Sequence, residues 1–298
     1  MIRISDILAF LDGEHVEYTF TGDINVGIDG FSSLSHYKPE TFTWVKKQAN
    51  LSDETDTSQI TLAFISNEVQ GNFQNTIATD RSKFAFFSTI EHFYNTQASS
   101  YSAPVGQFTY IAPEVKLGRN VKIGHNCVLD GDITIGDNTV IWHNVTIINR
   151  VAIGHDTEIQ SGCCIGHDGF GYSEDENHVK TMVKHYGGVT IGNNVFLANN
   201  VKVSRGTLDD TIIEDGVKID AFTEVGHNCH IEENAGLAYG CKLGGSTHIC
   251  KNAYVSAATI MNQCVIGENA FVGLGANVLK DVPANITVVG NPAKPLMK

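Results

Sequence analysis

The chain has 298 residues, of which 42% are hydrophobic and 18% charged, and its formal net charge is −13. This length and hydrophobic content suffice for one large buried core or two ordinary ones. No run of about eighteen apolar residues occurs, and the start, MIRISDILAF, lacks the features of a secretory signal, so we expect a cytoplasmic protein without a membrane span. The acidic balance, without a basic tail or patch, argues against nucleic acid as a partner.

Residues 1–100 predict a small α/β domain. Two helices are expected, a short one capped by Ser5 and an amphipathic one over 81–94. Strand-like runs lie between them at 17–20, 42–46 and 60–66. The polar segment 94–102 is the expected linker to the rest of the chain.

Residues 101–285 repeat an apolar side chain every six positions. The series is unbroken from Ile111 to Ile165, resumes at 191–203, and continues from Ile213 to Met261 before a one-residue slip. A period of six suits neither a helix face nor a hairpin meander. It suits three short strands per coil with the aliphatic side chain inward, and therefore predicts a parallel β-helix of about eight coils. Residues 286–298 form a C-terminal tail.

Two breaks interrupt the repeat, and function is expected there. The segment 167–188 is too long and too polar for a coil, so it should be a loop extruded from a corner. The motif R-G-T-L-D-D-T at 205–211 leaves the repeat out of register, which predicts a local bulge.

The seven cysteines follow the repeat rather than a disulfide or metal pattern. Their number is odd, no C-x-x-C pair occurs, and five share one slot of the repeat: Cys127, Cys163, Cys229, Cys241 and Cys264. We interpret them as small packing residues in a reducing compartment.

Four I/V-G-H-N/D tetrapeptides place histidines at 125, 155, 167 and 227. A histidine at a coil corner is more often a solvated turn residue than a base. His227 stands out because it lies one coil, eighteen residues, before Gly245. Stacking of coils would bring the Gly245 N–H next to the imidazole, which provides a general base beside an oxyanion donor, as acyl transfer from a thioester requires.

Several motifs resemble one family, the UDP-3-O-acylglucosamine N-acyltransferases of lipid A assembly (LpxD), within the hexapeptide-repeat acyltransferases. In the repeat region these are D-G-F-G-Y (168–172), K-H-Y-G-G-V-T-I-G (184–192), R-G-T-L-D-D-T (205–211), K-I-D (218–220) and V-G-H-N (225–228). In the first hundred residues G-F-S-S-L (30–34), K-P-E-T-F-T-W (38–44) and L-A-F-I-S-N (62–67) look like the family's uridine-binding domain. The resemblance implies a left-handed β-helix and an N-acyltransferase of lipopolysaccharide synthesis.

The resemblance also implies roles for individual residues. His227 would be the general base, Asp220 the carboxylate that orients it, and Gly245 the oxyanion donor, while Trp44 would stack on uracil. Further substrate contacts would come from Asp168, Phe170, Tyr172, His185 and Arg205.

The acyl donor stays open between two alternatives. The family uses acyl carrier protein, whereas the ending V-V-G-N-P-A-K-P (288–295) resembles hexapeptide acetyltransferases that use acetyl-coenzyme A to modify nucleotide-linked amino sugars for surface polysaccharide. Gly244 and Lys294 are the expected donor contacts. No metal and no permanently bound cofactor are expected, and the family packs such prisms as homotrimers with active sites between subunits.

Two rival functions use the same prism. A zinc hydrolyase of the carbonic anhydrase type would bind its metal through histidines such as His227 and His230, but it leaves Asp220 and the 205–211 motif unexplained. A non-catalytic assembly scaffold would leave the extruded loop without a role.

Overall fold

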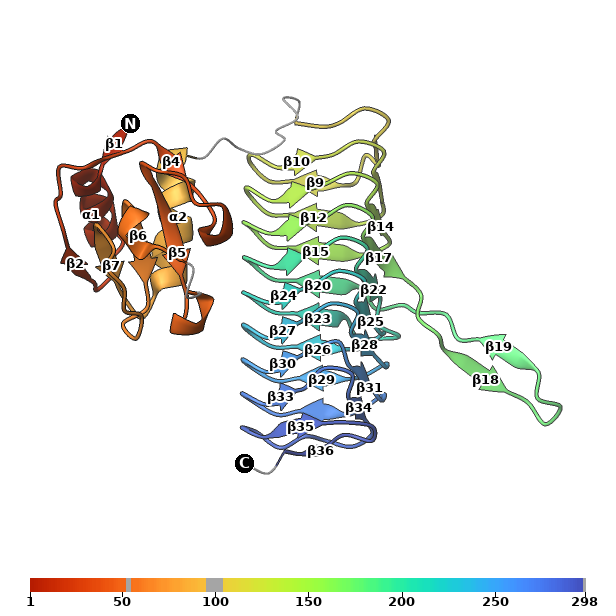
Figure 1. The fold of residues 1–298 in the computed structure, drawn as a ribbon. Helices are drawn as coiled ribbons and strands as arrows, with labels where there is room; N and C mark the ends of the chain where they lie inside the picture. Colours follow the sequence, from red (N-terminus) through yellow and green to blue (C-terminus); the bar gives the residue numbers. More distant parts are fainter. Residues whose placement is uncertain (52–54, 95–103, 297–298) are drawn as a thin grey trace. The chain divides into compact units, whose positions relative to one another are not determined.

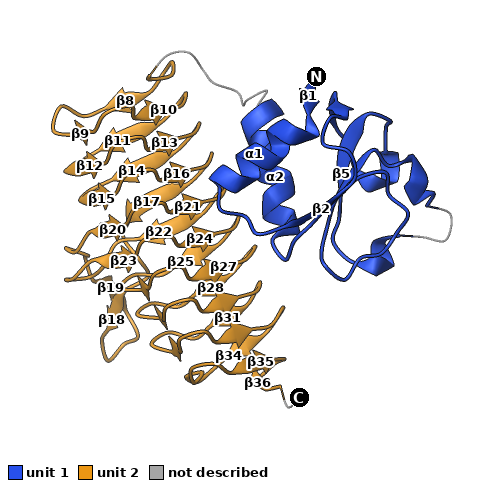
Figure 2. Ribbon diagram, turned by 90° about the vertical axis from the view of Figure 1, so that its left-hand side faces the viewer, with its two compact units in different colours: residues 1–100 blue, residues 101–298 orange. Residues whose placement is uncertain are grey.

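The computed structural model describes residues 1–51, 55–94 and 104–296. The chain divides into two compact units, Met1–Ser100 and Tyr101–Lys298, which are described separately (Figure 2). In the described part of the chain, no helix is both long and apolar enough to cross a bilayer. The linker predicted at 94–102 lies, apart from its first residue, outside the described residues.

The first unit is a five-stranded sheet packed against helices. The sheet order is β2 (Thr19–Thr21), β7 (Thr76–Ala78), β6 (Leu62–Ile65), β5 (Thr41–Val45) and β4 (Gly30–Phe31), and a separate pair joins β1 (Ile2–Arg3) to β3 (Gly27–Ile28). The helices are α1 (Ile4–Gly13), α2 (Ser82–Tyr94) and the short 3₁₀ turns η1 (Leu34–His36), η2 (Gln48–Asn50) and η3 (Thr57–Gln59). Phe42, Phe64 and Ile77 of the sheet form one core with Ile4, Ile7 and Leu11 of α1.

The N-terminal cap of α1 differs from the prediction. The helix begins at Ile4 with Arg3 as N-cap, so Ser5 lies inside the first turn. The carboxylate of Asp6 accepts a hydrogen bond from the Arg3 N–H at 2.8 Å. The carboxylate of the third helical residue thus accepts from the backbone N–H of the N-cap residue, which would otherwise have no partner. A cap by Ser5 is therefore not needed.

The second unit is a left-handed parallel β-helix whose coils stack as a three-sided prism (Figure 1). Face 1 contains β10 (Lys122–Ile123), β13 (Val140–Ile141), β16 (Glu158–Ile159), β21 (Phe196–Leu197), β24 (Lys218–Ile219), β27 (Gly236–Leu237), β30 (Tyr254–Val255), β33 (Phe271–Val272), β35 (Thr287–Val289) and β36 (Lys294–Pro295). Face 2 contains β8 (Tyr110–Ile111), β11 (Val128–Asp130), β14 (Thr146–Ile148), β17 (Cys164–His167), β22 (Lys202–Ser204), β25 (Glu224–Val225), β28 (Lys242–Leu243), β31 (Thr259–Ile260) and β34 (Asn277–Val278). Face 3 contains β9 (Lys116–Leu117), β12 (Ile133–Ile135), β15 (Val151–Ile153), β20 (Val189–Ile191), β23 (Thr211–Ile213), β26 (His230–Ile231), β29 (His248–Ile249) and β32 (Val265–Ile266).

The faces meet at three edges, which we call corners. Corner 1 joins face 1 to face 2, corner 2 joins face 2 to face 3, and corner 3 joins face 3 to face 1. In the described residues face 1 has ten strands, face 2 nine and face 3 eight, so the number of coils differs slightly from the eight expected.

Stacking in register builds the core of the prism. Ile123 pairs with Ile141 and Ile141 with Ile159, so equivalent residues of successive coils form ladders of buried aliphatic side chains. The five cysteines predicted to share a packing slot are all buried in this core. These free thiols replace the Val or Ala of other coils.

The slip in the repeat lies one hexad earlier than predicted, between Val255 and Ile260 rather than after Met261. Ile260 is 1% exposed and points inward, whereas Met261, the predicted inward residue, is 45% exposed. Lys242 and Leu243 pair with Thr259 and Ile260, so the deletion lies in the corner before β31. The chain absorbs a missing residue at a corner because a deletion within a strand would turn the aliphatic side chain outward.

The extruded segment leaves the prism at corner 2, between β17 and β20. It forms an arm whose hairpin pairs β18 (Tyr172–Glu174) with β19 (Lys180–Met182), and it projects well beyond the coils (Figure 1). The 205–211 motif bulges from the same corner on the next coil, between β22 and β23.

Candidate active site

The irregular segments and the candidate base all lie along corner 2. The arm, the 205–210 bulge, His227 after β25 and Gly245 after β28 follow one another on successive coils of that corner. An eighteen-residue step carries the chain once around the prism, so residues distant in sequence become neighbours here.

His227 lies directly against Gly245. A Cβ placed on Gly245 would be 2.5 Å from Nε2 and 2.7 Å from Cε1 of the His227 ring. Only glycine fits this contact without moving the ring. The structure thus brings together the imidazole and the glycine that coil stacking predicted.

The backbone N–H groups of His227 and Gly245 each follow a corner glycine. At several such positions a side chain one coil further on accepts from the N–H: His125 caps Gln107 at 2.7 Å and Asp137 caps Arg119 at 2.7 Å. Gly245 has no side chain to cap His227. Within the described residues neither the His227 N–H nor the Gly245 N–H is paired with an acceptor, so both can donate to a ligand.

Asn228 determines which nitrogen of His227 carries the proton. Asn228 Oδ1 accepts from the Thr207 N–H at 3.1 Å and from Thr207 Oγ1 at 2.9 Å, which identifies this atom as the amide oxygen. His227 Nδ1 lies 3.0 Å from the same oxygen and must donate to it. Neutral His227 therefore has its free lone pair on Nε2, the nitrogen beside Gly245.

Asp220 does not contact His227 within one chain. It follows β24 at corner 1, whereas His227 lies at corner 2, one full face away. Its carboxylate accepts from the Ala221 N–H at 2.7 Å. Within this chain the side chain that bonds His227 Nδ1 is that of Asn228, not that of Asp220.

The D-G-F-G-Y segment of the arm covers a pair of imidazoles. A Cβ on Gly169 would be 2.7 Å from Cδ2 of His227, and one on Gly171 would be 3.0 Å from Cε1 of His185. The two histidine rings meet edge to face with centroids 5.2 Å apart. Both glycines of the motif are therefore required where the arm approaches these rings.

His185 is 4% exposed and is held by one hydrogen bond, from Nδ1 to the Val183 carbonyl at 2.9 Å. Because a carbonyl only accepts, Nδ1 carries the proton and neutral His185 has an acceptor at Nε2. No partner of that Nε2 is found among the described residues. A buried acceptor without a partner costs about 1–3 kcal/mol, which suggests that a ligand completes it.

A half-buried carboxylate, that of Asp210, anchors the base of the arm. Asp210 accepts from the Gly188 N–H at 2.7 Å, from both terminal nitrogens of Arg150 at 2.5 and 3.1 Å, and from Thr190 Oγ1 at 3.0 Å. Burial raises the pKa of Asp210, but the hydrogen bonds from Gly188, Arg150 and Thr190 outweigh it and hold this pKa below its usual range. Arg205 adds a bond from Nε to the Gly187 carbonyl at 2.6 Å.

Two cavities border the imidazole pair. One, of about 390 Å³, is lined by Gly169, Phe170, Ser204, Glu224, Gly226, His227, Leu243, Gly244, Gly245, Ser246, Asn262 and Gln263. The other, of about 510 Å³, is lined by Ile148, Asn149, His167, Asp168, Lys184, His185, Tyr186 and Arg205. Apart from Tyr172 and Asp220, the residues predicted for the chemistry and the sugar thus surround one of these two spaces. Tyr172 packs on Phe170 at a centroid distance of 4.8 Å.

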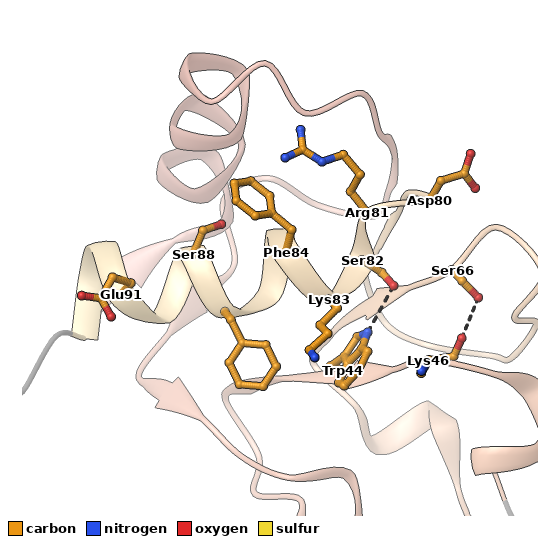
Figure 3. Close-up of a pocket in the computed structure, with 11 residues that line it drawn as sticks. Trp44, Lys46, Ser66, Asp80, Arg81, Ser82, Lys83, Phe84, Ser88 and Glu91 are labelled. Carbon is orange, nitrogen blue, oxygen red and sulfur yellow. Dashed lines mark hydrogen bonds between the residues drawn. The ribbon is translucent and has the colours of Figure 1, made fainter. Parts of the chain in front are cut away.

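Trp44 borders a separate cavity of about 770 Å³ within the first unit (Figure 3). Its indole N–H donates to Ser82 Oγ at 3.1 Å, and its ring packs against Phe86 and Phe87. Lys46, Arg81 and Lys83 also line this cavity, and the Arg81 guanidinium lies 4.2 Å from the Phe84 ring centre. The space offers aromatic surface together with cations.

The remaining candidates lie apart from His227. Lys294 on β36 borders a cavity of about 410 Å³ formed by residues 278–295. His230 lies on face 3 and bonds Glu214 through Nε2 at 2.7 Å, whereas His227 lies at corner 2 and bonds Asn228 through Nδ1 at 3.0 Å. His125 stacks on His143, and His155 bonds Asp156.

Sequence reasoning missed Asn228, Thr207, Arg150 and Asp210. The signal for Asn228 was its place in the V-G-H-N motif directly beside His227. No sequence signal connects Arg150 to Asp210, because sixty residues and the whole arm separate them.

Comparison with known proteins shows which repeat family and which enzymes the chain is similar to. The family model for the bacterial transferase hexapeptide (six repeats) matches residues 132–167 and 210–245. A UDP-3-O-acylglucosamine N-acyltransferase of Delftia acidovorans is 31% identical over 124 residues, covering 36% of this chain and 37% of that protein. An acyl-[acyl-carrier-protein]–UDP-N-acetylglucosamine O-acyltransferase of Pseudomonas paraeruginosa is 36% identical over 110 residues, covering 36% of this chain and 43% of that protein.

A solved structure agrees in fold. The crystal structure of LpxA, a UDP-N-acetylglucosamine acyltransferase from Bacteroides fragilis 9343, superposes with a TM-score of 0.58 at 26% identity, covering 63% of this chain and 72% of that one. The sequence matches span less than half the length of the curated relatives. Residues 132–167 and 210–245 thus carry the bacterial transferase hexapeptide repeat, and the solenoid is similar in fold to that of a UDP-N-acetylglucosamine acyltransferase.

Proposed function

We propose that this protein transfers an acyl group from a thioester to the amine of a nucleotide-linked amino sugar, forming an amide, as a UDP-3-O-acylglucosamine N-acyltransferase of lipid A synthesis. The observation that carries the proposal is the His227 ring with its Nε2 against Gly245, whose N–H has no acceptor among the described residues. The similarity to N- and O-acyltransferases of UDP-sugars supports the same reaction class.

The reaction uses these groups in sequence. The unprotonated amine attacks the thioester carbon, a C–N bond forms, and His227 Nε2 takes the proton released from the amine. The Gly245 N–H donates to the oxyanion, while Asn228 holds the Nδ1 proton. Collapse of the intermediate breaks the C–S bond, and the imidazolium returns its proton to the departing thiolate.

His185 favours an amine over a hydroxyl as the nucleophile. An amine has two N–H groups, so it can give one proton to His227 and donate the other to the acceptor nitrogen of His185, once the D-G-F-G segment moves aside. A hydroxyl has only one proton and would leave His185 unpaired. N-acylation therefore suits this pair of imidazoles better than O-acylation.

The sugar of the acceptor would occupy the cavity that borders His185. Arg205 and Asp168, whose nearest atoms are 4.0 Å apart, border the 510 Å³ space and suit the polar sugar. Phe170 and Tyr172 offer apolar surface for an acyl chain. The uracil would stack in the Trp44 cavity, where Lys46, Arg81 and Lys83 suit the attached phosphates.

Acyl carrier protein is the donor that we propose first, because it stands in the names of the O-acyltransferase relatives. Acetyl-coenzyme A is the alternative, with Lys294 meeting a donor phosphate and Gly244 lining the thioester path. Mass spectrometry of the product formed with each donor separates the two.

We further propose that three chains assemble and share their active sites. Phe222 and Tyr239 are 54% and 58% exposed at corner 1, where they stack edge to face beside Asp220. A neighbouring chain packed against this corner would cover them and bring Asp220 toward a partner's site. Sedimentation equilibrium should give the mass of three chains. In the Phe222→Asp variant the measured mass should fall toward that of a single chain.

The decisive experiment is His227→Ala. General acid–base catalysis contributes about 10²–10⁴-fold, so kcat should fall by that factor while the far-ultraviolet circular dichroism stays unchanged. Full activity in this variant would refute the proposal.

We place the enzyme in the cytoplasm, because a reducing compartment suits its seven free cysteines.

A further inference from the structure

We propose that Glu232, His248 and Cys250 form a binding site for one divalent transition-metal ion of the zinc or cobalt class. The three residues lie on face 3 and at corner 3, whereas the acyl-transfer site lies along corner 2. The proposed function does not use them.

The solenoid brings the three ligands together from two adjacent coils. Glu232 directly follows β26. On the next coil His248 is the first residue of β29, and Cys250 directly follows that strand. One oxygen of Glu232, one ring nitrogen of His248 and the sulfur of Cys250 all lie within 4.8 Å of one another. All three side chains are half-buried, so an ion can reach them from solvent.

The donor set indicates the class of metal. Imidazole nitrogen, thiolate sulfur and carboxylate oxygen together suit Zn²⁺ and Co²⁺, whereas magnesium and calcium prefer oxygen alone. Three protein ligands leave a fourth tetrahedral position for water.

Neighbouring groups already hold two of the ligands in place. Glu232 Oε1 accepts from His248 Nε2 at 2.7 Å, and its other oxygen accepts from the Lys251 N–H at 2.7 Å. The His230 ring stacks on His248 with centroids 4.8 Å apart and planes 8° apart. Metal binding exchanges the Glu232–His248 hydrogen bond for two metal bonds, moves the imidazole proton to Nδ1 and releases the thiol proton to solvent.

The surrounding charge favours a cation. Glu214, Glu233 and Glu268 stand near the cluster, and their charges act on Lys251 or Cys250. Lys251, which bonds Glu233, is the positive side chain among them. The excess of carboxylates attracts a divalent ion to this corner.

The test is titration of the purified full-length protein with Co²⁺ alone, followed by absorption spectroscopy, and with Zn²⁺ alone, followed by calorimetry. One ion per chain should bind with a sulfur-to-cobalt charge-transfer band. Cys250→Ala should abolish that band. Glu232→Gln should weaken zinc binding by at least about 10–100-fold, because the loss of a group that only orients a metal ligand already has an effect of that size.

Cys164→Ala is the matched control, because Cys164 is the other half-buried cysteine of the described residues and its neighbouring charge is Lys202 rather than a carboxylate. It should bind Co²⁺ as the unchanged protein does. An unaltered band in Cys250→Ala, or no band in a protein that remains folded by circular dichroism, would overturn the proposal.

Discussion

Gly245 and Gly169 lie against the same imidazole ring, and each is a glycine because a side chain would strike it. The contact of Gly245 is with Nε2, the atom that takes the proton in the proposed mechanism. The contact of Gly169 is with Cδ2 and Cβ. These two residues therefore position the base through packing rather than through hydrogen bonds.

Gly245→Ala should lower kcat by about 100-fold. The new Cβ would lie 2.5 Å from His227 Nε2, so either the ring or the backbone N–H must move, and a displacement of about 1 Å can cost that much. Steady-state kinetics measures the loss. Gly216→Asn is the control, since Asn120, Asn138 and Asn234 occupy the same left-handed slot of corner 3 in other coils. It should keep its activity; equal losses in both variants would argue against a specific role of Gly245.

In the proposed mechanism Asn228 acts through His227, so removal of its side chain should affect kcat more than KM. Asn228→Ala should reduce kcat by about 100-fold or more, because the Nδ1 proton loses its acceptor and the tautomer is no longer fixed. Asn228→Asp keeps an oxygen at the acceptor position and should restore a large part of kcat. If the Asp variant is no better than the Ala variant, orientation of the ring is not what Asn228 provides.

At the scale of elements, the arm depends on its anchor at Asp210. Asp210→Asn should destabilise the base of the arm by about 1–3 kcal/mol, because the half-exposed Arg150 loses its counterion while the hydrogen bonds are partly kept. Hydrogen exchange of residues 184–190 reports the change.

The effect should depend on pH with a definite sign. The folded pKa of Asp210 lies below its ordinary 3.8, so the ionised carboxylate stabilises the fold above that value, and the stabilisation is lost as the pH falls through the folded pKa. The two proteins should differ at pH 7 and converge below pH 3.8. A difference that grows on acidification would contradict this assignment.

The position of the slip in the repeat leads to a second prediction at the scale of elements, because it makes Ile260 rather than Met261 the inward residue. Ile260→Ala should lower the free energy of unfolding by about 2–4 kcal/mol, because it leaves a cavity in the ladder, whereas Met261→Ala should change it by less than about 0.5 kcal/mol. Urea denaturation of both variants distinguishes them. A larger loss in the Met261 variant would mean that the register of β31 is shifted.

For the whole molecule, the cysteines report on the solenoid alone, since all seven lie after residue 126. Burial raises the pKa of Cys163 and of Cys229 to about 12, so roughly one thiol in 10⁴ is ionised at pH 8. Iodoacetamide should therefore leave these two unmodified in the native protein and label them only after unfolding. Mass spectrometry of native and urea-treated samples checks this, and rapid native labelling of Cys229 would show that its coil opens.

The hexad pattern by itself determined the solenoid, its inward residues apart from the one at the slip, where Ile260 replaces Met261, and the meeting of His227 with Gly245. Each follows from the same cause: a strict period converts separation in sequence into stacking in space, and residues eighteen apart lie one above the other. The corners at which the arm and the bulge emerge also follow from where the period breaks.

Tertiary structure alone decided which side chains meet at the corners. Asp220 and His227 are seven residues apart, yet a face of the prism separates them, while Thr207 reaches Asn228 because the bulge departs from the period. Glu232, His248 and Cys250 converge because side chains of adjacent coils turn toward each other beyond the strand ends. Backbone period restricts where a residue lies, but rotamers and irregular turns determine what its side chain touches.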